Sequence, residues 1–115
     1  MIICVIESFK KQKVHYIRLQ VRKEETLRQV RTQVYQKINE LNELQKLRHK
    51  TENLTTMRML RASNANPSVE LINAQEKDFS ESQLDQPISS LNLSDENVIT
   101  LYDSTEYNEY QALQK

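Results

Sequence analysis

The residues of this chain that could carry out chemistry are few and lie far apart. The two histidines are His15 and His49, and the single cysteine is Cys4. Neither histidine has a partner at metal-ligand spacing, and zinc sites need three or four ligands; we expect His15 to lie inward or at the rim of a strand. A thiolate nucleophile needs a base that a third group orients, and no carboxylate is placed to do so beside Cys4 and His15. We therefore predict no catalytic residue, no metal site and no cofactor.

The absence of glycine excludes two further classes of site. None of the 115 residues is glycine, although average usage would supply about eight. P-loops and dinucleotide-binding fingerprints need glycine where the backbone approaches a phosphate closely, so neither is present. Turns with positive φ must then use Asn or Asp, and the candidates are Asn64, Asn66, Asn73 and Asn92.

Composition and charge indicate which partners and which cellular compartment to expect. Sixteen basic residues balance sixteen acidic ones, so no overall field favours nucleic acid or an anionic membrane. One cysteine excludes an internal disulfide, no apolar run reaches a membrane-spanning length, and Met1 leads into a strand rather than a secretory signal. We expect an intracellular protein of the cytoplasm or the nucleus. One local basic stretch stands out: Lys10, Lys11, Lys13, Arg18, Arg22 and Lys23.

The first half of the chain predicts a hairpin followed by a helix. Residues 1–6 are an apolar run, residues 10–13 a polar bend, and residues 15–21 alternate with period two, which is typical of a strand with one buried face. Thr26 and Gln29 form a capping-box pair. Apolar residues then recur at spacings of three and four, as on one face of a helix: Leu27, Val30, Val34, Ile38 and Leu41.

This helix is expected to continue to about residue 50. Leu44 and Leu47 extend the apolar spacing, and no proline intervenes. Two hypotheses remain open for the stripe formed by Leu41, Leu44 and Leu47. It folds back onto its own domain, or it docks a partner helix, since exposed apolar stripes usually mark contacts.

The second half predicts two more strands, an insertion and a tail. Residues 56–62 and 98–102 read as strands, and residues 69–72 as a short one. The segment from about 63 to 86 is a polar insertion in which Phe79 is expected to plug the rim of the core. The acidic residues Asp78, Glu81 and Asp85 are expected to lie in a solvated loop. Residues 104–115 are polar, include Tyr107 and Tyr110, and are predicted to form a tail that follows a single domain of residues 1–103.

The core positions resemble those of ubiquitin-like domains, which have the β-grasp fold. In that family an apolar residue opens a short helical turn, another follows five positions later, and two inward residues lie on the last strand. Ile88, Leu93, Ile99 and Leu101 match these positions. Matching residues in the front half are Ile17, Leu19 and Val21 on the second strand and Leu27, Val30 and Val34 on the helix. The resemblance spans about residues 1–102 and implies an α+β fold, with a mixed four- to five-stranded sheet packed on one long amphipathic helix.

The carboxyl end departs from the conjugated members of that family. Those members end in two glycines, which an activating enzyme adenylates. This chain ends at Lys115 without any glycine. We therefore expect a ubiquitin-like protein of the non-conjugated type rather than a modifier.

Strand alternation predicts a face for partner binding, because side chains along a strand point alternately to opposite sides. If Met1, Ile3 and Val5 point at the helix, the residues between them point away from it. The predicted partner-binding residues of this outer face are Ile2, Cys4, Ile6, Tyr16, Arg18, Arg58, Leu60, Val98, Thr100 and Tyr102. Sheet faces open to water are normally polar, whereas this band is largely apolar. We expect it to be exposed for contact; the alternative is that the chain's own helix, insertion or tail covers it.

Two functions follow as hypotheses. The first is a non-catalytic protein-protein interaction subunit or adaptor, acting as a structural component of a larger multiprotein complex. The resemblance supports it, because partners of ubiquitin-like domains most often grip the outer face. The second is a β-grasp signalling module that binds a small GTPase or an acidic partner through the basic hairpin, with Lys11, Arg18 and Arg22. Both imply protein partners, and neither implies specific nucleic acid, a membrane span or a small-molecule substrate.

Overall fold

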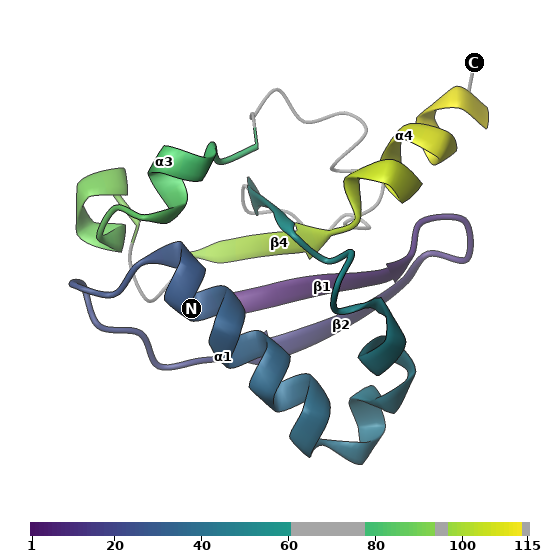
Figure 1. Cartoon of the computed structure of the whole chain (residues 1–115), viewed down its shortest axis with the longest axis horizontal. Helices are drawn as coiled ribbons and strands as arrows, with labels where there is room; N and C mark the ends of the chain where they lie inside the picture. Colours follow the sequence, from purple (N-terminus) through teal and green to yellow (C-terminus); the bar gives the residue numbers. More distant parts are fainter. Residues whose placement is uncertain (61–77, 94–96, 114–115) are drawn as a thin grey trace.

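The strands form one mixed sheet in the computed structural model (Figure 1), which describes residues 1–60, 78–93 and 97–113. The strands β1 (Ile2–Ser8), β2 (Lys13–Arg18), β3 (Thr56–Leu60) and β4 (Val98–Tyr102) lie in the order β2-β1-β4-β3. The central strands β1 and β4 are parallel, and β2 and β3 pair with them antiparallel. With helix α1 (Leu27–Glu40) after the hairpin, this is an α+β domain of ubiquitin-like arrangement, which confirms the predicted fold class. The predicted short strand at residues 69–72 lies outside the described residues.

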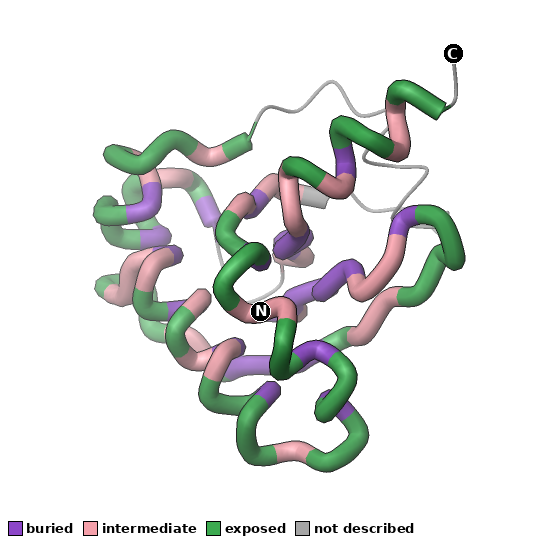
Figure 2. The backbone as a smooth tube through the Cα atoms, turned by 45° about the vertical axis from the view of Figure 1, so that its right-hand side comes forward, coloured by how far each residue is buried: buried purple, intermediate pink, exposed green. Residues whose placement is uncertain are grey.

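The inner face of the sheet and α1 enclose the main core. Met1, Ile3 and Val5 are fully or almost fully buried, as are the α1 residues Val30 and Val34. The inward residues Ile17, Met57, Ile99 and Leu101 complete the sheet side of this core. Consecutive residues are buried along the middle of β1 and along β4, because both faces of these strands are covered, whereas the buried positions of α1 recur along one side (Figure 2). The inward-facing residues of the strands and the apolar side of α1 therefore pack against each other, as the sequence predicts.

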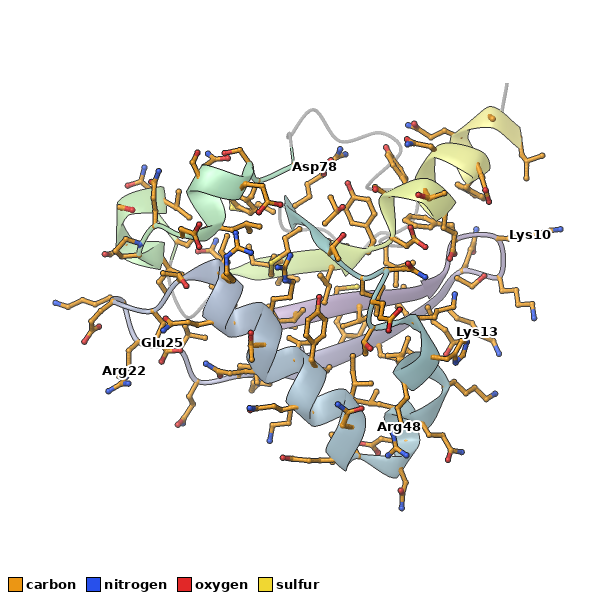
Figure 3. The ribbon with its side chains drawn as sticks, viewed as in Figure 1. Lys10, Lys13, Arg22, Glu25, Arg48 and Asp78 are labelled. Atoms are coloured by element: carbon orange, nitrogen blue, oxygen red, sulfur yellow. The ribbon has the colours of Figure 1, made fainter. Side chains whose placement is uncertain are left out.

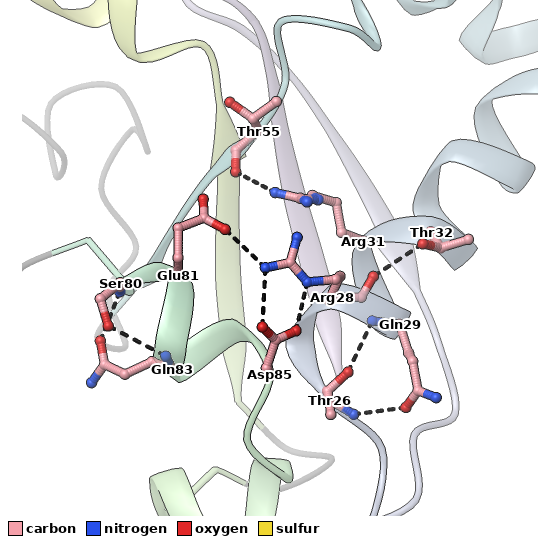
Figure 4. A network of polar contacts seen from close by, with 10 residues as sticks. All are labelled: Thr26, Arg28, Gln29, Arg31, Thr32, Thr55, Ser80, Glu81, Gln83 and Asp85. Carbon is pink, nitrogen blue, oxygen red and sulfur yellow. Dashed lines mark hydrogen bonds and ion pairs between the residues drawn. The ribbon is translucent and has the colours of Figure 1, made fainter.

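The start of α1 is held by the predicted capping box. The Gln29 N–H donates to Thr26 Oγ1 (3.2 Å), and the Thr26 N–H donates to Gln29 Oε1 (2.9 Å) (Figure 4). Such reciprocal caps satisfy backbone donors that the first helical turn leaves free. The first turn of α1 is thus set by the side chains of its own sequence.

The acidic residues of the insertion are exposed to solvent, as expected, but they are ion-paired, and Glu81 begins a short helix rather than lying in a loop. Arg28 on α1 donates to Asp85 (2.6 Å) and Glu81 (2.8 Å) at the short helix α3 (Glu81–Leu84), as Figure 4 shows. Asp78 accepts a hydrogen bond from Arg58 on β3 (2.9 Å). Phe79 lies between these groups and packs against the core rim, as predicted.

The long helix is interrupted, which corrects the expectation that it continues to residue 50. α1 ends at Glu40, and Leu41 is extended (φ −94°, ψ 123°). The chain then forms the 3₁₀ helix η1 (Asn42–Lys50), in which Leu44 and Leu47 are buried in the core. A straight helix would have carried both leucines past the small sheet. Arg48 stabilises the break, because it donates to the carbonyls of Ile38 (3.1 Å) and Leu41 (3.3 Å).

In the part of the chain that the structure describes, two residues with positive φ stand at turns where glycine would be favoured. Asn92 (φ 60°) ends the short helix η2 (Ile88–Leu91), and it is one of the predicted positions. Gln12 (φ 56°) lies in the turn between β1 and β2 and was not predicted. The other candidates, Asn64, Asn66 and Asn73, lie outside the described residues.

The carboxyl-terminal segment is a helix rather than the predicted polar tail. Helix α4 (Ser104–Leu113) follows β4 and rises from its end at the upper right of Figure 1, and its Tyr110 ring stacks on Phe9 next to the β1–β2 turn. Asp103 caps it, since Asp103 Oδ1 accepts from the N–H groups of Thr105 (2.9 Å) and Glu106 (3.4 Å). Asp is among the preferred residues at this position.

Replacing Leu47 with alanine tests the folded-back leucine stripe. Leu47 is fully buried, so Leu47→Ala should lower the free energy of unfolding by about 3 kcal/mol, from lost burial plus a cavity. The neighbouring exposed residue Gln45 provides a matched control, and Gln45→Ala should change it by less than about 0.5 kcal/mol. Urea denaturation of both variants measures the difference. Similar losses in the two variants would contradict the burial of the stripe.

Candidate partner-binding face

The strand register brings the ten predicted residues onto one face of the sheet, in rows that cross the strands. One row is Arg18, Ile2, Val98 and Leu60, and the next is Tyr16, Cys4, Thr100 and Arg58. Ile6 and Tyr102 lie beyond them, toward the β1–β2 turn, and contact each other. The outer face is therefore a continuous surface, as the alternation predicts.

The exposure of this face differs from the expectation. Cys4, Thr100 and Tyr102 are fully buried and Ile6 is almost fully buried, so they are not open to a partner. Tyr16 is 60% exposed and Arg18 is exposed, whereas Ile2 and Val98 are half-buried. We call these last four residues the open corner. Arg58 is also half-buried, and the side chain of Leu60 lies outside the part of the chain that the structure describes.

Helix α4 covers the opposite end of the outer face. Ile6, Phe9, Tyr102 and Tyr107 form a second buried cluster, with Val14 and Tyr110 packed against it. We call this group the aromatic cluster. The rings of Phe9 and Tyr102 meet edge to face at 5.9 Å, and Tyr107 lies 5.4 Å from both. Aromatic pairs at such separations add to the stability that burial provides. Of the three predicted alternatives for a cover, the carboxyl-terminal segment therefore fills this role at the aromatic end.

One glutamate joins α4 to two other elements. Glu106 Oε1 accepts a hydrogen bond from the Phe9 N–H (2.9 Å), and Glu106 Oε2 lies 3.2 Å from Lys50 Nζ. Lys50 Nζ also donates to the carbonyl oxygen of Glu7. Hydrogen bonds with an ionised partner are stronger than neutral ones. Glu106 thus ties α4 to the β1–β2 turn and to the end of η1.

Arg58 and Asp78 close the side of the aromatic cluster near β3. The Arg58 guanidinium lies 5.5 Å from the centre of the Tyr107 ring and donates to Asp78. The Tyr102 hydroxyl donates to the same carboxylate. Burial, together with the hydrogen bond to Asp78 and the charge of that carboxylate, raises the pKa of Tyr102. Arg58 therefore serves the internal packing of this face rather than an open contact.

Sequence reasoning missed Phe9, Glu106, Tyr107 and Tyr110 as parts of this face. A signal was present, because Asp103 and Glu106 have the spacing of a capping box. Tyr107 and Tyr110 lie three residues apart, which places them on one side of a helix. The polar composition of residues 104–115 concealed this signal.

The Cys4 thiol lies in the buried part of the outer face. Burial raises its pKa to about 12, and a hydrogen bond with the Tyr16 side chain offsets part of that rise. A thiol with such a pKa carries very little thiolate at neutral pH and is a poor nucleophile. The geometry therefore assigns Cys4 a packing role.

A hollow of about 480 Å³ lies between the hairpin and η1. Its lining includes Glu7, His15, Lys13 and Lys46. His15 Nε2 lies 2.9 Å from Glu7 Oε1, and the hydrogen bond with His15 lowers the pKa of Glu7, with the charges of His15, Lys13 and Lys46 adding to the effect. His15 is half-buried at the rim, in line with the sequence analysis. Within residues 1–60, 78–93 and 97–113, no group of three or more His, Cys, Asp or Glu side chains could hold a metal ion.

The basic stretch does not form one patch. Lys10 lies at the β1–β2 turn and Arg22 at the opposite end of the molecule (Figure 3). Arg22 lies 3.5 Å from Glu25, and the charge of Lys13 acts on Glu7. Lys10, Lys11, Arg18 and Lys23 are exposed, with no carboxylate within ion-pair distance among the described residues. The positive charge is thus spread along the length of the hairpin and the loop after it.

Comparison of the chain with protein-family models, with curated proteins and with solved structures found no match. Among the helices of the described residues, none is long and apolar enough to cross a membrane. The fold and the geometry of the outer face therefore carry the functional argument.

Alkylation of Cys4 tests the buried state of the outer face. At pH 8 a thiol with a pKa of about 12 is ionised to the order of one part in ten thousand. Iodoacetamide should therefore modify the native protein at least a hundredfold more slowly than the urea-unfolded protein, whose thiol has an ordinary pKa. Mass spectrometry of timed samples measures both rates. Rapid modification of the native protein would show that this part of the face is open.

Proposed function

We propose that the protein is a non-catalytic, non-conjugated ubiquitin-like subunit or adaptor that binds a partner protein through the open corner. The observation that carries the proposal is the exposure of Tyr16 (60%) beside Arg18. Tyr and Arg are among the residues that most often dominate the binding energy of protein interfaces. The half-buried Ile2 and Val98 extend this surface with apolar atoms.

The position of β2 supports the same surface. β2 lies at one edge of the sheet, and no strand among the described residues pairs with its outer side. Edge strands offer unpaired backbone donors and acceptors to another chain. Tyr16 and Arg18 are on this strand, so side-chain and backbone contacts are available at the same place.

The small size of the open corner favours a reversible contact within a larger assembly. Complete burial of one large apolar side chain contributes about 1.5–3 kcal/mol. Association itself costs several kcal/mol in lost freedom of motion. Three apolar side chains at the corner (Ile2, Tyr16 and Val98) then supply a moderate affinity, which neighbouring subunits of a complex would reinforce.

Replacement of Tyr16 with aspartate tests this proposal. Tyr16→Asp should reduce recovery of the native partner at least tenfold, as expected for a residue at the centre of an interface, while circular dichroism shows that the protein stays folded. The control is Gln36→Asp, which introduces the same charge at an exposed position of α1. Affinity purification of tagged full-length protein with quantitative mass spectrometry measures recovery. Equal recovery with both variants would refute the open corner as the binding site. Charged substitutions at Ile6 or Tyr102 are unsuitable, because both side chains are buried.

A second candidate function is recognition of a small GTPase or another acidic partner through the basic hairpin. The exposed Lys10, Lys11 and Lys23 favour it, because none has a carboxylate within ion-pair distance among the described side chains. Contacts of this kind weaken steeply with ionic strength, whereas apolar contacts persist.

Salt and charge reversal separate the two functions. If the hairpin carries recognition, Lys10→Glu combined with Lys11→Glu, both exposed at the β1–β2 turn, should reduce recovery of the partner at least tenfold, and 0.5 M salt should do the same. Lys37→Glu on α1 is the control for a change of charge at an exposed position. The same purification measures all three. Recovery that persists in high salt and in the double variant would exclude the hairpin.

A further inference from the structure

Helix α4 is held over the outer face by few side chains. Tyr107 is the only buried residue of the helix, and Tyr110 is half-buried against Phe9, with ring centres 5.8 Å apart. Leu113, near the end of the helix, is 70% exposed. Elements with few buried apolar contacts open at low free-energy cost. α4 therefore has the features of an element that can separate from the sheet while the main core stays folded.

The remaining attachment of α4 is polar and partly exposed. The two contacts of Glu106, with the Phe9 N–H and with Lys50 Nζ, lie at the first turn of the helix. The side chains of Lys50 and Glu106 are 29% and 28% exposed, so water and salt reach this pair. Loss of the Glu106 carboxylate would remove both contacts at once and leave the rings of Tyr107 and Tyr110, with Arg58 against Tyr107, as the main attachment.

We propose that α4 is a displaceable cover that regulates the outer face, and that Glu106 holds it closed. The proposal rests on the proposed function, because it concerns access to the same face. When α4 separates, Ile6, Phe9 and Tyr102 become accessible at the end of the outer face near the β1–β2 turn. An apolar surface of this kind does not stay exposed to water without cost, so opening is coupled to binding.

The contacts of α4 define the partner that would replace it. Opening removes the acceptor of the Phe9 N–H and the carboxylate beside Lys50, and it removes the aromatic ring that packs on Phe9 and Tyr102. α4 supplies these groups from adjacent residues, Glu106 and Tyr107. The fitting partner is therefore a protein helix in which a carboxylate side chain directly precedes an aromatic one.

Amide hydrogen exchange on the isolated full-length protein tests the cover. Glu106→Ala removes both contacts, and Glu109→Ala is the matched control, because it makes the same change one turn later, where no ion pair of the glutamate is seen among the described residues. In Glu106→Ala the amides of Phe9 and α4 should exchange at least tenfold faster than in Glu109→Ala, while those of α1 stay unchanged. Exchange detected by NMR resolves the single amides. Equal exchange in the two variants, or equal acceleration in α1, would overturn the proposal.

A helical peptide tests the replacement. The probe is a peptide of residues 103–113 with a hydrocarbon staple between positions 108 and 112, which are both exposed in α4. The staple removes most of the cost of helix formation in a short peptide. The Glu106→Ala protein should bind this peptide at least fivefold more tightly than the Glu109→Ala protein, because its own helix competes less. A peptide with alanine at position 106 should bind more weakly to both.

Equal affinity of the two proteins for the stapled peptide, or no binding, would refute α4 as a displaceable cover. Neither measurement uses the native partner. A failure of the cover therefore stays distinct from a failure of the open corner, which the recovery of Tyr16→Asp decides.

Discussion

The central parallel strands are buried on both faces, and this constraint determines how the rest of the chain must fold. β1 contributes Ile3 and Val5 to one face and Cys4 and Ile6 to the other, and all four are buried. β4 repeats the arrangement with Ile99 and Leu101 against Thr100 and Tyr102. A sheet of this kind needs a cover on each side. α1 covers the inner face, and α4 covers the aromatic end of the outer face.

The sheet and the start of α1 could be predicted from the sequence because their signals are local. Alternation sets the two faces of each strand, and the outer-face rows follow once the strands are paired in register. Thr26 and Gln29 specify the capping box within four residues. In each case the residues that carry the signal also make the contact, so the prediction does not depend on distant parts of the chain.

The break at Leu41 could not be predicted from the same pattern. Leu41, Leu44 and Leu47 are spaced by three, which suits one face of an α-helix over a short stretch and also matches the three residues per turn of a 3₁₀ helix. The choice between them depends on tertiary contacts. The core has room for Leu44 and Leu47 only if the chain turns, and Arg48 supplies donors for carbonyls at the end of α1. Neither condition can be read from spacing.

For a related reason, the sequence predicted which residues lie on the outer face but not how exposed they are. Which residues share the outer face depends on strand parity, whereas their exposure depends on what packs over them. The cover depends on contacts between Phe9 and the adjacent residues Glu106 and Tyr107, which lie almost a hundred positions later in the sequence. Glu106 accepts from the Phe9 N–H, and the ring of Tyr107 packs on that of Phe9. Only the fold brings these residues together.

Tyr102 couples the covered end of the outer face to the rest of the sheet. It is the last residue of β4, its ring meets Phe9 and Tyr107, and its hydroxyl donates to Asp78. Asp78 also accepts from Arg58, which pairs in register with Thr100 at the middle of the face. Since Asp103, the cap of α4, follows Tyr102 directly, a movement of α4 must alter the surroundings of this ring. A change at α4 therefore reaches β4 through Tyr102, and β3 through the contact of Asp78 with Arg58.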